Sequence, residues 1–195
     1  MARIATLRRF VADITGLIET TSDEASILAG GRGLLADLVA TDDWLPEVYA
    51  QPHPKYYQQY LLYGDPLDRL SIVSFVWGPG QETPVHDHRV WGLVGVLRGA
   101  EVARTYRYDD HGALVESPPE QLERGAVAAV SPTIGDIHRI ANAFADRVSI
   151  SIHVYGGNIG TIRRSVFDIG GGQPKDFVSG YANDAVPNLW ADGHH

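Results

Sequence analysis

The feature that most constrains the fold is a series of short runs rich in β-branched and aromatic residues, which follow one another from residue 56 to residue 155. Glycine, proline and aspartate separate the runs, as in RLSIVSFVW, VWGLVGVLRG and RVSISIHVY. Such runs with regular turn signals are typical of an antiparallel barrel or sandwich, because a parallel sheet needs crossover helices between its strands. We therefore predict a mainly β protein with a small barrel over residues 56–167.

The regions on either side of the barrel have a different character. A first amphipathic helix is predicted from apolar residues at spacings of three and four, namely Ile4, Leu7, Phe10, Val11, Ile14, Leu17 and Ile18. A second helix is expected from the capping signal at residues 22–24, and a third, short helix after the glycines at positions 30, 31 and 33.

The chain is expected to form one domain over residues 1–195. Its helical part covers residues 1–50 and packs on the barrel, although docking of the first helix on a membrane surface or a partner is the alternative. Residues 168–195 are rich in glycine, asparagine, aspartate and proline and are predicted to be an irregular tail. A histidine pair at the C-terminus is read as part of a flexible end rather than as metal ligands.

Composition and charge exclude several classes of function. The 195 residues are 44% hydrophobic, which suffices for one core, and no apolar run is long enough to span a membrane. The formal net charge of −8 argues against nucleic-acid binding, which needs clustered lysine and arginine. The N-terminus lacks the features of a signal peptide, so we expect a cytoplasmic protein. Nothing in the sequence indicates the oligomeric state.

Two histidines, His86 and His88, lie one residue apart in an apolar stretch. In a strand, side chains at i and i+2 point to the same face, so both imidazoles can reach one metal ion. About fifty residues later, GDIHRIAN supplies His138. The chain has no cysteine, so a metal must be held by histidine, aspartate, glutamate or tyrosine. The alternative for each histidine is a hydrogen-bonded core residue.

The spacing of these residues resembles the two motifs of the cupins, in which a small β-barrel or jelly roll holds a metal. By this resemblance, His86, His88 and His138 are the three metal ligands. The cupin glutamate ligand would lie at Gly92 or Leu93, so no carboxylate is available there. The resemblance therefore implies a charge-neutral site with three histidines, which leaves room for an anionic ligand from the substrate.

One branch of the cupins also lacks this glutamate ligand. The stretch from residue 69 to residue 101 and the later SISIHVYGGNIGTIRR resemble the thiol dioxygenases, the family of cysteine dioxygenase and 3-mercaptopropionate dioxygenase. The similarity extends from about Tyr56 to Arg164. It implies an Fe(II) cofactor and a reaction in which both atoms of O2 are added to the thiol of a small mercapto-carboxylic acid, giving a sulfinate.

Three polar residues alternate with apolar ones in SISIHVY, so Ser151, His153 and Tyr155 share one face of a strand. Alternation alone would also suit a solvated outer face. The resemblance to thiol dioxygenases instead implies a hydrogen-bonded relay in which Tyr155 points at the substrate while His153 and Ser151 orient it. In this interpretation His153 is not a metal ligand.

The expected substrate follows from where the chain departs from the animal cysteine dioxygenases. Those enzymes carry a cysteine–tyrosine thioether, which cannot form here because no cysteine is present, and Gly92 lies near that position. Gln59 stands where they have a carboxylate-binding arginine. The glutamine form resembles the bacterial 3-mercaptopropionate dioxygenases, which implies that Arg164 binds the substrate carboxylate; the neighbouring Arg163 is the alternative.

We therefore expect conversion of 3-mercaptopropionate to 3-sulfinopropionate, with cysteine or mercaptosuccinate as alternative substrates. Two further function classes stay open at this stage. One is a cupin isomerase or hydrolase that uses Zn, Mn or Ni as a Lewis acid. The other is a non-catalytic cupin that binds a small ligand.

Overall fold

The computed structural model describes residues 3–191. Two α-helices, α1 (Ile4–Thr20) and α2 (Glu24–Val39), and a short 3-10 helix (Glu47–Tyr49) precede the strands. The strands are β1 (Gln58–Gly64), β2 (Ser71–Trp77), β3 (Val85–His86), β4 (Gly92–Arg98), β5 (Ala100–Tyr108), β6 (Leu114–Glu116), β7 (Glu120–Glu123), β8 (Val127–Val130), β9 (His138–Asn142), β10 (Ser149–Tyr155), β11 (Arg164–Phe167) and β12 (Lys175–Phe177). The expected mainly β fold with N-terminal helices is confirmed.

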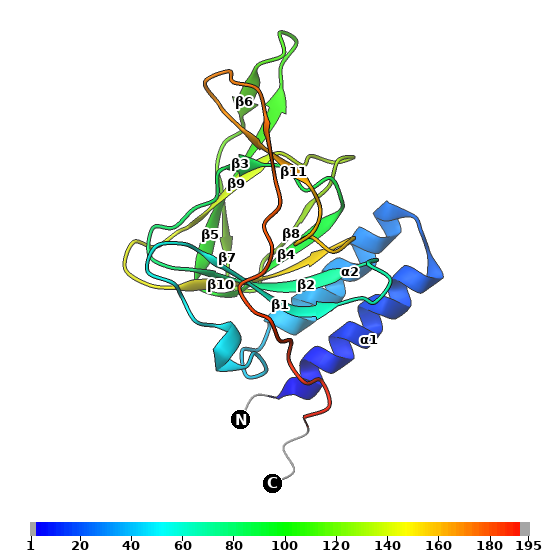
Figure 1. Ribbon diagram of the computed structural model, residues 1–195. Helices are drawn as coiled ribbons and strands as arrows, with labels where there is room; N and C mark the ends of the chain where they lie inside the picture. The colour runs from blue at the N-terminus through cyan, green and yellow to red at the C-terminus, as the bar shows by residue number, and fades with distance from the viewer. Residues whose placement is uncertain (1–2, 192–195) are drawn as a thin grey trace.

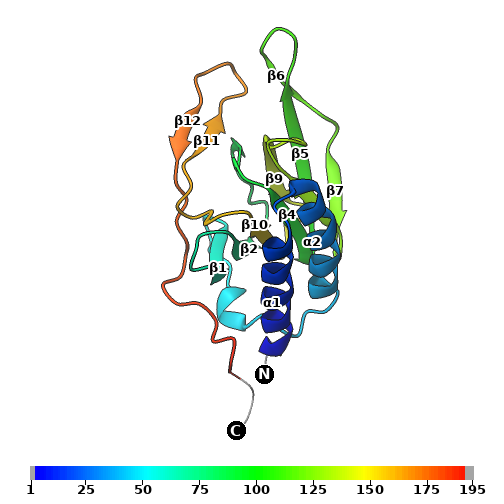
Figure 2. The ribbon, with the colours of Figure 1, turned by 90° about the vertical axis from the view of Figure 1, so that its right-hand side faces the viewer.

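The strands form two sheets that face each other across the molecule (Figures 1 and 2). One has the order β1-β2-β10-β4-β8, and the other has the order β12-β11-β3-β9-β5-β6, with β7 also paired to β5. All of the strand pairs are antiparallel. This strand order makes neighbours of strands that are distant in sequence. For example, β10 lies between β2 and β4 in the middle of its sheet.

The helices cover the outer face of the five-stranded sheet (Figure 1). The apolar stripe of α1 packs into a core with outward-facing residues of the strands, which include Ile150, Ile152 and Val154. Leu7 and Ile14 in α1 are fully buried. The stripe thus packs on its own domain, as the sequence predicts. Both faces of β10 are consequently buried, and its polar side chains point into the barrel.

The prediction of a separate third helix is wrong, because α2 runs without a break through the glycines at positions 30, 31 and 33. Its start is as expected: the Asp23 side chain accepts a hydrogen bond from the Ser26 backbone N–H at 2.9 Å. The glycine at position 31 has a packing role. A Cβ there would lie 2.7 Å from Leu93 Cδ1, so the absence of a side chain lets α2 approach β4 closely.

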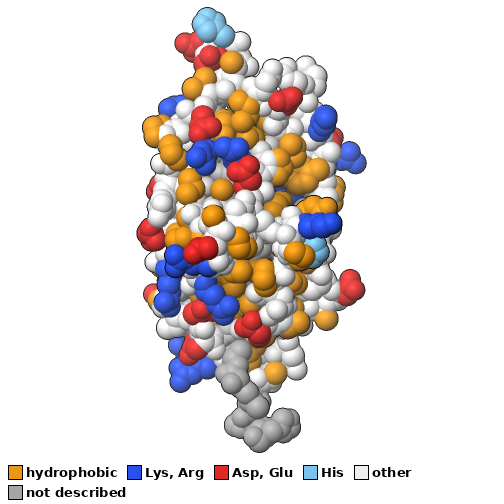
Figure 3. All heavy atoms as spheres, turned by 90° about the vertical axis from the view of Figure 1, so that its left-hand side faces the viewer, with side chains coloured by type: hydrophobic (Ala, Val, Ile, Leu, Met, Phe, Trp, Pro, Cys, Tyr) orange, Lys and Arg blue, Asp and Glu red, His pale blue; other side chains and the backbone are white. Residues whose placement is uncertain are grey.

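The tail expected to be irregular contains one strand among its described residues, 168–191. This is β12, which pairs with β11 in a hairpin. The C-terminal histidine pair lies outside the described residues. No helix within residues 3–191 is long and apolar enough to cross a membrane. On the face drawn in Figure 3, acidic and basic side chains are interspersed with apolar ones.

Candidate functional site

Three buried histidines converge inside the barrel at the seven-stranded sheet. His86 at the end of β3 pairs directly with His138 at the start of β9, and His88 follows two residues later. Each of the three offers a ring nitrogen, and these atoms all lie within 4.8 Å of one another. That spacing fits a single metal ion bound by all three.

The sequence predicts that His86 and His88 converge because they share a face of one strand, and the structure confirms the convergence but not this reason. The strand β3 ends at His86, so His88 lies beyond it and the two side chains do not share a face of one regular strand. A carboxylate holds His88 in place instead. Asp136 accepts hydrogen bonds from the backbone N–H groups of His88 and Arg89, at 3.0 and 2.9 Å.

Hydrogen bonds also orient two of the imidazole rings. His86 Nδ1 lies 3.0 Å from the carbonyl oxygen of Pro84, and His88 Nδ1 lies 2.8 Å from a carboxylate oxygen of Asp136. When Nδ1 donates these bonds, Nε2 of each ring is left unprotonated for a metal. The sequence analysis missed Asp136, although its place in GDIH, two residues before His138, was the available signal.

Burial favours the form of these histidines that binds metals. It lowers the pKa of His86 to about 4, and it holds the pKa values of His88 and His138 well below the usual value. All three imidazoles are therefore neutral near pH 7. Three neutral nitrogen donors suit Fe(II), Ni, Cu or Zn, so the residues present fit a transition metal without selecting one.

A continuous chain of hydrogen bonds runs along β10 inside the barrel. Ser151 Oγ lies 2.8 Å from His153 Nε2, and His153 Nδ1 lies 2.8 Å from the Tyr155 hydroxyl. All three residues are buried. The Phe75 ring stacks on the His153 imidazole with centroids 3.9 Å apart, which fixes the ring. A solvated outer face, the alternative left open by the sequence, is excluded by this burial.

The relay meets the three histidines at Tyr155. The Tyr155 ring stacks on His88 with centroids 5.4 Å apart. Burial raises the pKa of Tyr155, so its hydroxyl is protonated at neutral pH. His153, in contrast, does not belong to the group of three converging ring nitrogens. The arrangement therefore separates three potential ligands from a neighbouring proton-donating hydroxyl.

The two candidate arginines lie in different environments. The Arg163 side chain is 70% exposed and pairs with Asp176, whereas Arg164 is 3% exposed as a residue. Arg164 donates a hydrogen bond to Ser179 Oγ at 2.6 Å, and its guanidinium carbon lies 4.6 Å from the centre of the Phe177 ring. Its Nε has no hydrogen-bond partner.

The charge of Arg164 acts on the site itself. It is among the causes that lower the pKa values of His86 and His88, and it opposes the rise in the pKa of Tyr155. The Phe177 ring that Arg164 covers also lies against His86, with ring centroids 6.4 Å apart, so Arg164, and not the exposed Arg163, borders the three histidines. A buried cation with an unpaired N–H is suited to bind an anionic ligand group.

Gln59 in β1 also lies on the inner side, where its side-chain oxygen is buried without a hydrogen-bond partner. Its strand neighbour Phe75 stacks with Tyr57, whose ring centroid lies 6.1 Å away. The sequence analysis did not single out Tyr57, although it lies two residues before Gln59, the available signal for a shared face. Burial raises the pKa of Tyr57, and the Arg164 charge opposes that rise, so both groups border the same space.

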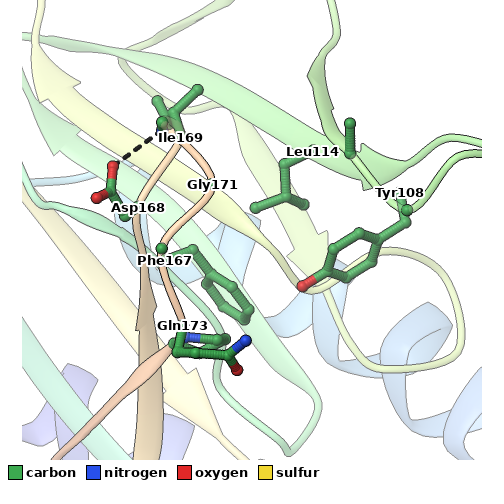
Figure 4. A pocket seen from close by; sticks show the side chains of 12 residues that line it. Tyr108, Leu114, Phe167, Asp168, Ile169, Gly171 and Gln173 are labelled. Carbon is green, nitrogen blue, oxygen red and sulfur yellow. Dashed lines mark hydrogen bonds between the residues drawn. The ribbon is translucent and has the colours of Figure 1, made fainter.

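A separate cavity of about 500 Å³ opens between the β5–β6 hairpin and the loop that joins β11 to β12. Figure 4 shows Phe167, Leu114 and Tyr108 around it, with a backbone turn in which Asp168 accepts a hydrogen bond from Gly170. None of the candidate ligands or relay residues lines this cavity.

The chain is similar to one known family and to several solved structures. A family model described as cysteine dioxygenase type I matches residues 37–168, which is more than half of the chain. Among solved structures, a Klebsiella pneumoniae protein with a double-stranded β-helix domain is 21% identical, with 57% of this chain and 82% of that chain covered and a TM-score of 0.42. A cupin superfamily protein from Desulfitobacterium hafniense is 18% identical, with 60% and 94% covered and a TM-score of 0.44.

Proposed function

The chain belongs to the cysteine dioxygenase type I family, and on this premise we propose that it is an iron(II)-dependent dioxygenase for a small mercapto-carboxylic acid. The observation that carries the proposal is the combination inside one barrel of three convergent neutral histidines, a tyrosine relay and a buried arginine. Simple ligand storage would have no need for the relay. The reaction consumes a thiol and O2 and yields a sulfinate.

Iron held by His86, His88 and His138 would bring the thiolate and O2 together and supply electrons to oxygen. The protein residues do the rest of the work. Asp136 keeps the His88 ring in its ligating orientation through the bond to Nδ1. Tyr155 presents a protonated hydroxyl beside His88, where it can donate a hydrogen bond to the bound substrate.

We propose 3-mercaptopropionate as the substrate. Arg164 offers its unpaired Nε–H to the carboxylate, and the buried oxygen of Gln59 is free to accept a hydrogen bond but supplies no charge. Cysteine would also bring an ammonium group into a space that already holds the Arg164 cation, which argues against it. Mercaptosuccinate, with a second carboxylate, would leave that second charge without a cationic partner in this proposal.

A competition assay among 3-mercaptopropionate, cysteine and mercaptosuccinate tests the substrate. The proposal predicts the highest kcat/KM for 3-mercaptopropionate. Preference for cysteine would retain the chemistry and overturn the role assigned to Gln59 and Arg164. A metal cupin that acts as a Lewis acid would instead consume no O2 with any of the three. The cytoplasmic location expected from the sequence stays a prediction.

A further inference from the structure

A buried carboxyl group lies beyond the serine end of the relay. Glu101 is the second residue of β5, two positions after Gly99, and it is 0% exposed. Neither carboxyl oxygen forms a hydrogen bond within normal limits of distance and angle. Its cross-strand neighbours are Asn142 on β9 and Leu122 on β7, both uncharged. An unpaired carboxylate in such a place is costly, so this position calls for an explanation.

The neighbours of Glu101 connect it to the relay. Burial raises its pKa to about 7, and the polar groups of Ser151 and Trp77 oppose the rise. Trp77 Nε1 itself donates a hydrogen bond to Ser151 Oγ at 3.1 Å. The Glu101 charge also contributes to the raised pKa of Tyr155, which lies at the other end of the relay. The adjoining residue, Ala100, donates its N–H to Ser149 Oγ at 3.2 Å and accepts from that hydroxyl at 3.0 Å, so Glu101 lies beside the end of β10 where the relay begins.

The hydrogen-bonding capacity of Ser151 allows two arrangements. A hydroxyl has one O–H donor and two acceptor positions, and Trp77 occupies one acceptor position. If Ser151 donates to His153 Nε2, its remaining position accepts from a protonated Glu101. If Ser151 instead accepts from His153 Nε2–H, its own O–H is left to donate to an ionised Glu101. Each arrangement satisfies Ser151 fully, and the two have opposite directions.

We propose that Glu101 is a positioning residue that sets the direction of the relay: its protonated carboxyl donates to Ser151, Ser151 donates to His153 Nε2, and His153 Nδ1–H donates to Tyr155. The Tyr155 hydroxyl is then free to donate to the substrate. This inference rests on the proposed function for its catalytic consequence. In this arrangement every group keeps its own hydrogen atom, so Ser151, His153 and Tyr155 all stay neutral.

Ionisation of Glu101 releases one proton to solvent and reverses this direction, because His153 gives up its proton on Nδ1 and takes one on Nε2. The carboxylate accepts from Ser151, His153 carries its proton on Nε2, and Tyr155 donates back to His153 Nδ1 instead of to the substrate. The titratable groups along the path are His153, whose pKa burial lowers to about 3, and Tyr155, whose pKa burial raises. Both stay neutral between pH 5 and 9. On β7 and β9, the residues paired with Glu101 do not titrate.

The first test needs no turnover. In the full chain labelled with ¹⁵N-histidine and loaded with diamagnetic Zn²⁺, NMR distinguishes the two tautomers of His153. We expect the proton on Nδ1 at pH 6 and on Nε2 at pH 8.5. In Glu101→Gln, whose amide N–H replaces the acid O–H, we expect Nδ1 at both pH values. Identical tautomers in this variant and the unchanged protein at pH 8.5 would overturn the proposal.

The second test measures kcat and KM against pH with 3-mercaptopropionate. The unchanged protein should lose kcat as the pH rises through about 7, and Glu101→Gln should lack that loss. Glu101→Leu should lower kcat at least 10-fold with little change in KM. Glu116→Gln, the same change on the adjacent β6, is the control and should behave like the unchanged protein. Absence of turnover by the unchanged protein would refute the proposed function, whereas the tautomer measurement would still decide the role of Glu101.

Discussion

Arg164 keeps its charge among aromatic rings and polar groups inside the protein, although most arginines lie in water. We expect Arg164→Met to raise the KM for 3-mercaptopropionate roughly 10- to 100-fold, because a charge-assisted hydrogen bond to a carboxylate contributes about 1.5–3 kcal/mol. Steady-state kinetics measure this. Arg163→Met on the exposed neighbour is the matched control, and equal effects of the two substitutions would contradict the assignment of Arg164.

Gly92 permits the position of the Tyr155 ring. A Cβ at residue 92 would lie 2.9 Å from Tyr155 Cδ1 and 3.0 Å from Val130 Cγ2. Gly92→Ala should therefore displace the Tyr155 hydroxyl and lower kcat by about 10-fold or more, since small misplacements of reacting groups are costly. Iron content should be unchanged. Gly16→Ala, where a Cβ would meet nothing within 4 Å, is the control; wild-type kcat in Gly92→Ala would show that the ring tolerates the methyl group.

Burial of Glu101 makes the stability of the protein depend on pH. The folded-state pKa of about 7 is above the ordinary value of 4.5, so the folded chain binds more protons than the unfolded chain between these values. The resulting stability is present below pH 4.5 and is lost as the pH rises through about 7. Urea denaturation should show that Glu101→Gln gains roughly 2 to 3 kcal/mol relative to the unchanged protein between pH 5 and pH 8. A constant difference would contradict this.

Helix α2 shows what packing adds to local propensity at the scale of an element. Glycine in a helix interior costs about 1 kcal/mol relative to alanine. At Gly33 an added Cβ meets nothing within 4 Å, whereas at Gly31 it meets Leu93. Gly33→Ala should therefore raise the melting temperature by a few degrees, and Gly31→Ala should be the less stable of the two. The reverse order would mean that the contact between α2 and β4 relaxes freely.

The same helix shows where sequence-based prediction fails. The glycines at positions 30, 31 and 33 predict an interruption because their propensity is local, whereas the close contact that favours glycine at position 31 is with Leu93 in β4, far away in the sequence. The strands behave differently. The alternation in β10 correctly predicts which side chains share a face, although both faces are buried and alternation alone does not predict that burial.

The candidate site was predictable to the extent that residue spacing determines it. The pair His86 and His88 and the shared face of the β10 residues follow from short-range patterns, whereas His138 as a third ligand and the relay were predicted from the family resemblance. Asp136 orients His88 across 48 residues, and Glu101 reaches the relay from another sheet, so neither role has a local signal. Arg164 and Arg163 are adjacent in sequence and differ only in which side chain the hairpin of β11 and β12 buries.

At the scale of the whole molecule, the barrel brings two sheets together so that one contributes the three histidines and the other contributes the relay. The N-terminal helices cover the outer face of the relay sheet, which allows its inner face to hold polar groups in a region without solvent. Low dielectric surroundings strengthen each hydrogen bond and penalise each unpaired charge. Substrate binding and proton positioning thus depend on the closure of the whole barrel.

The measurement that tests this account most directly is O2 consumption by anaerobically purified, iron-assayed protein supplied with 3-mercaptopropionate. We predict near-stoichiometric iron, O2 uptake matched by formation of 3-sulfinopropionate, and loss of both iron and uptake in His138→Ala. An iron-loaded protein that consumes no O2 with 3-mercaptopropionate, cysteine or mercaptosuccinate would contradict the assignment of thiol dioxygenase activity.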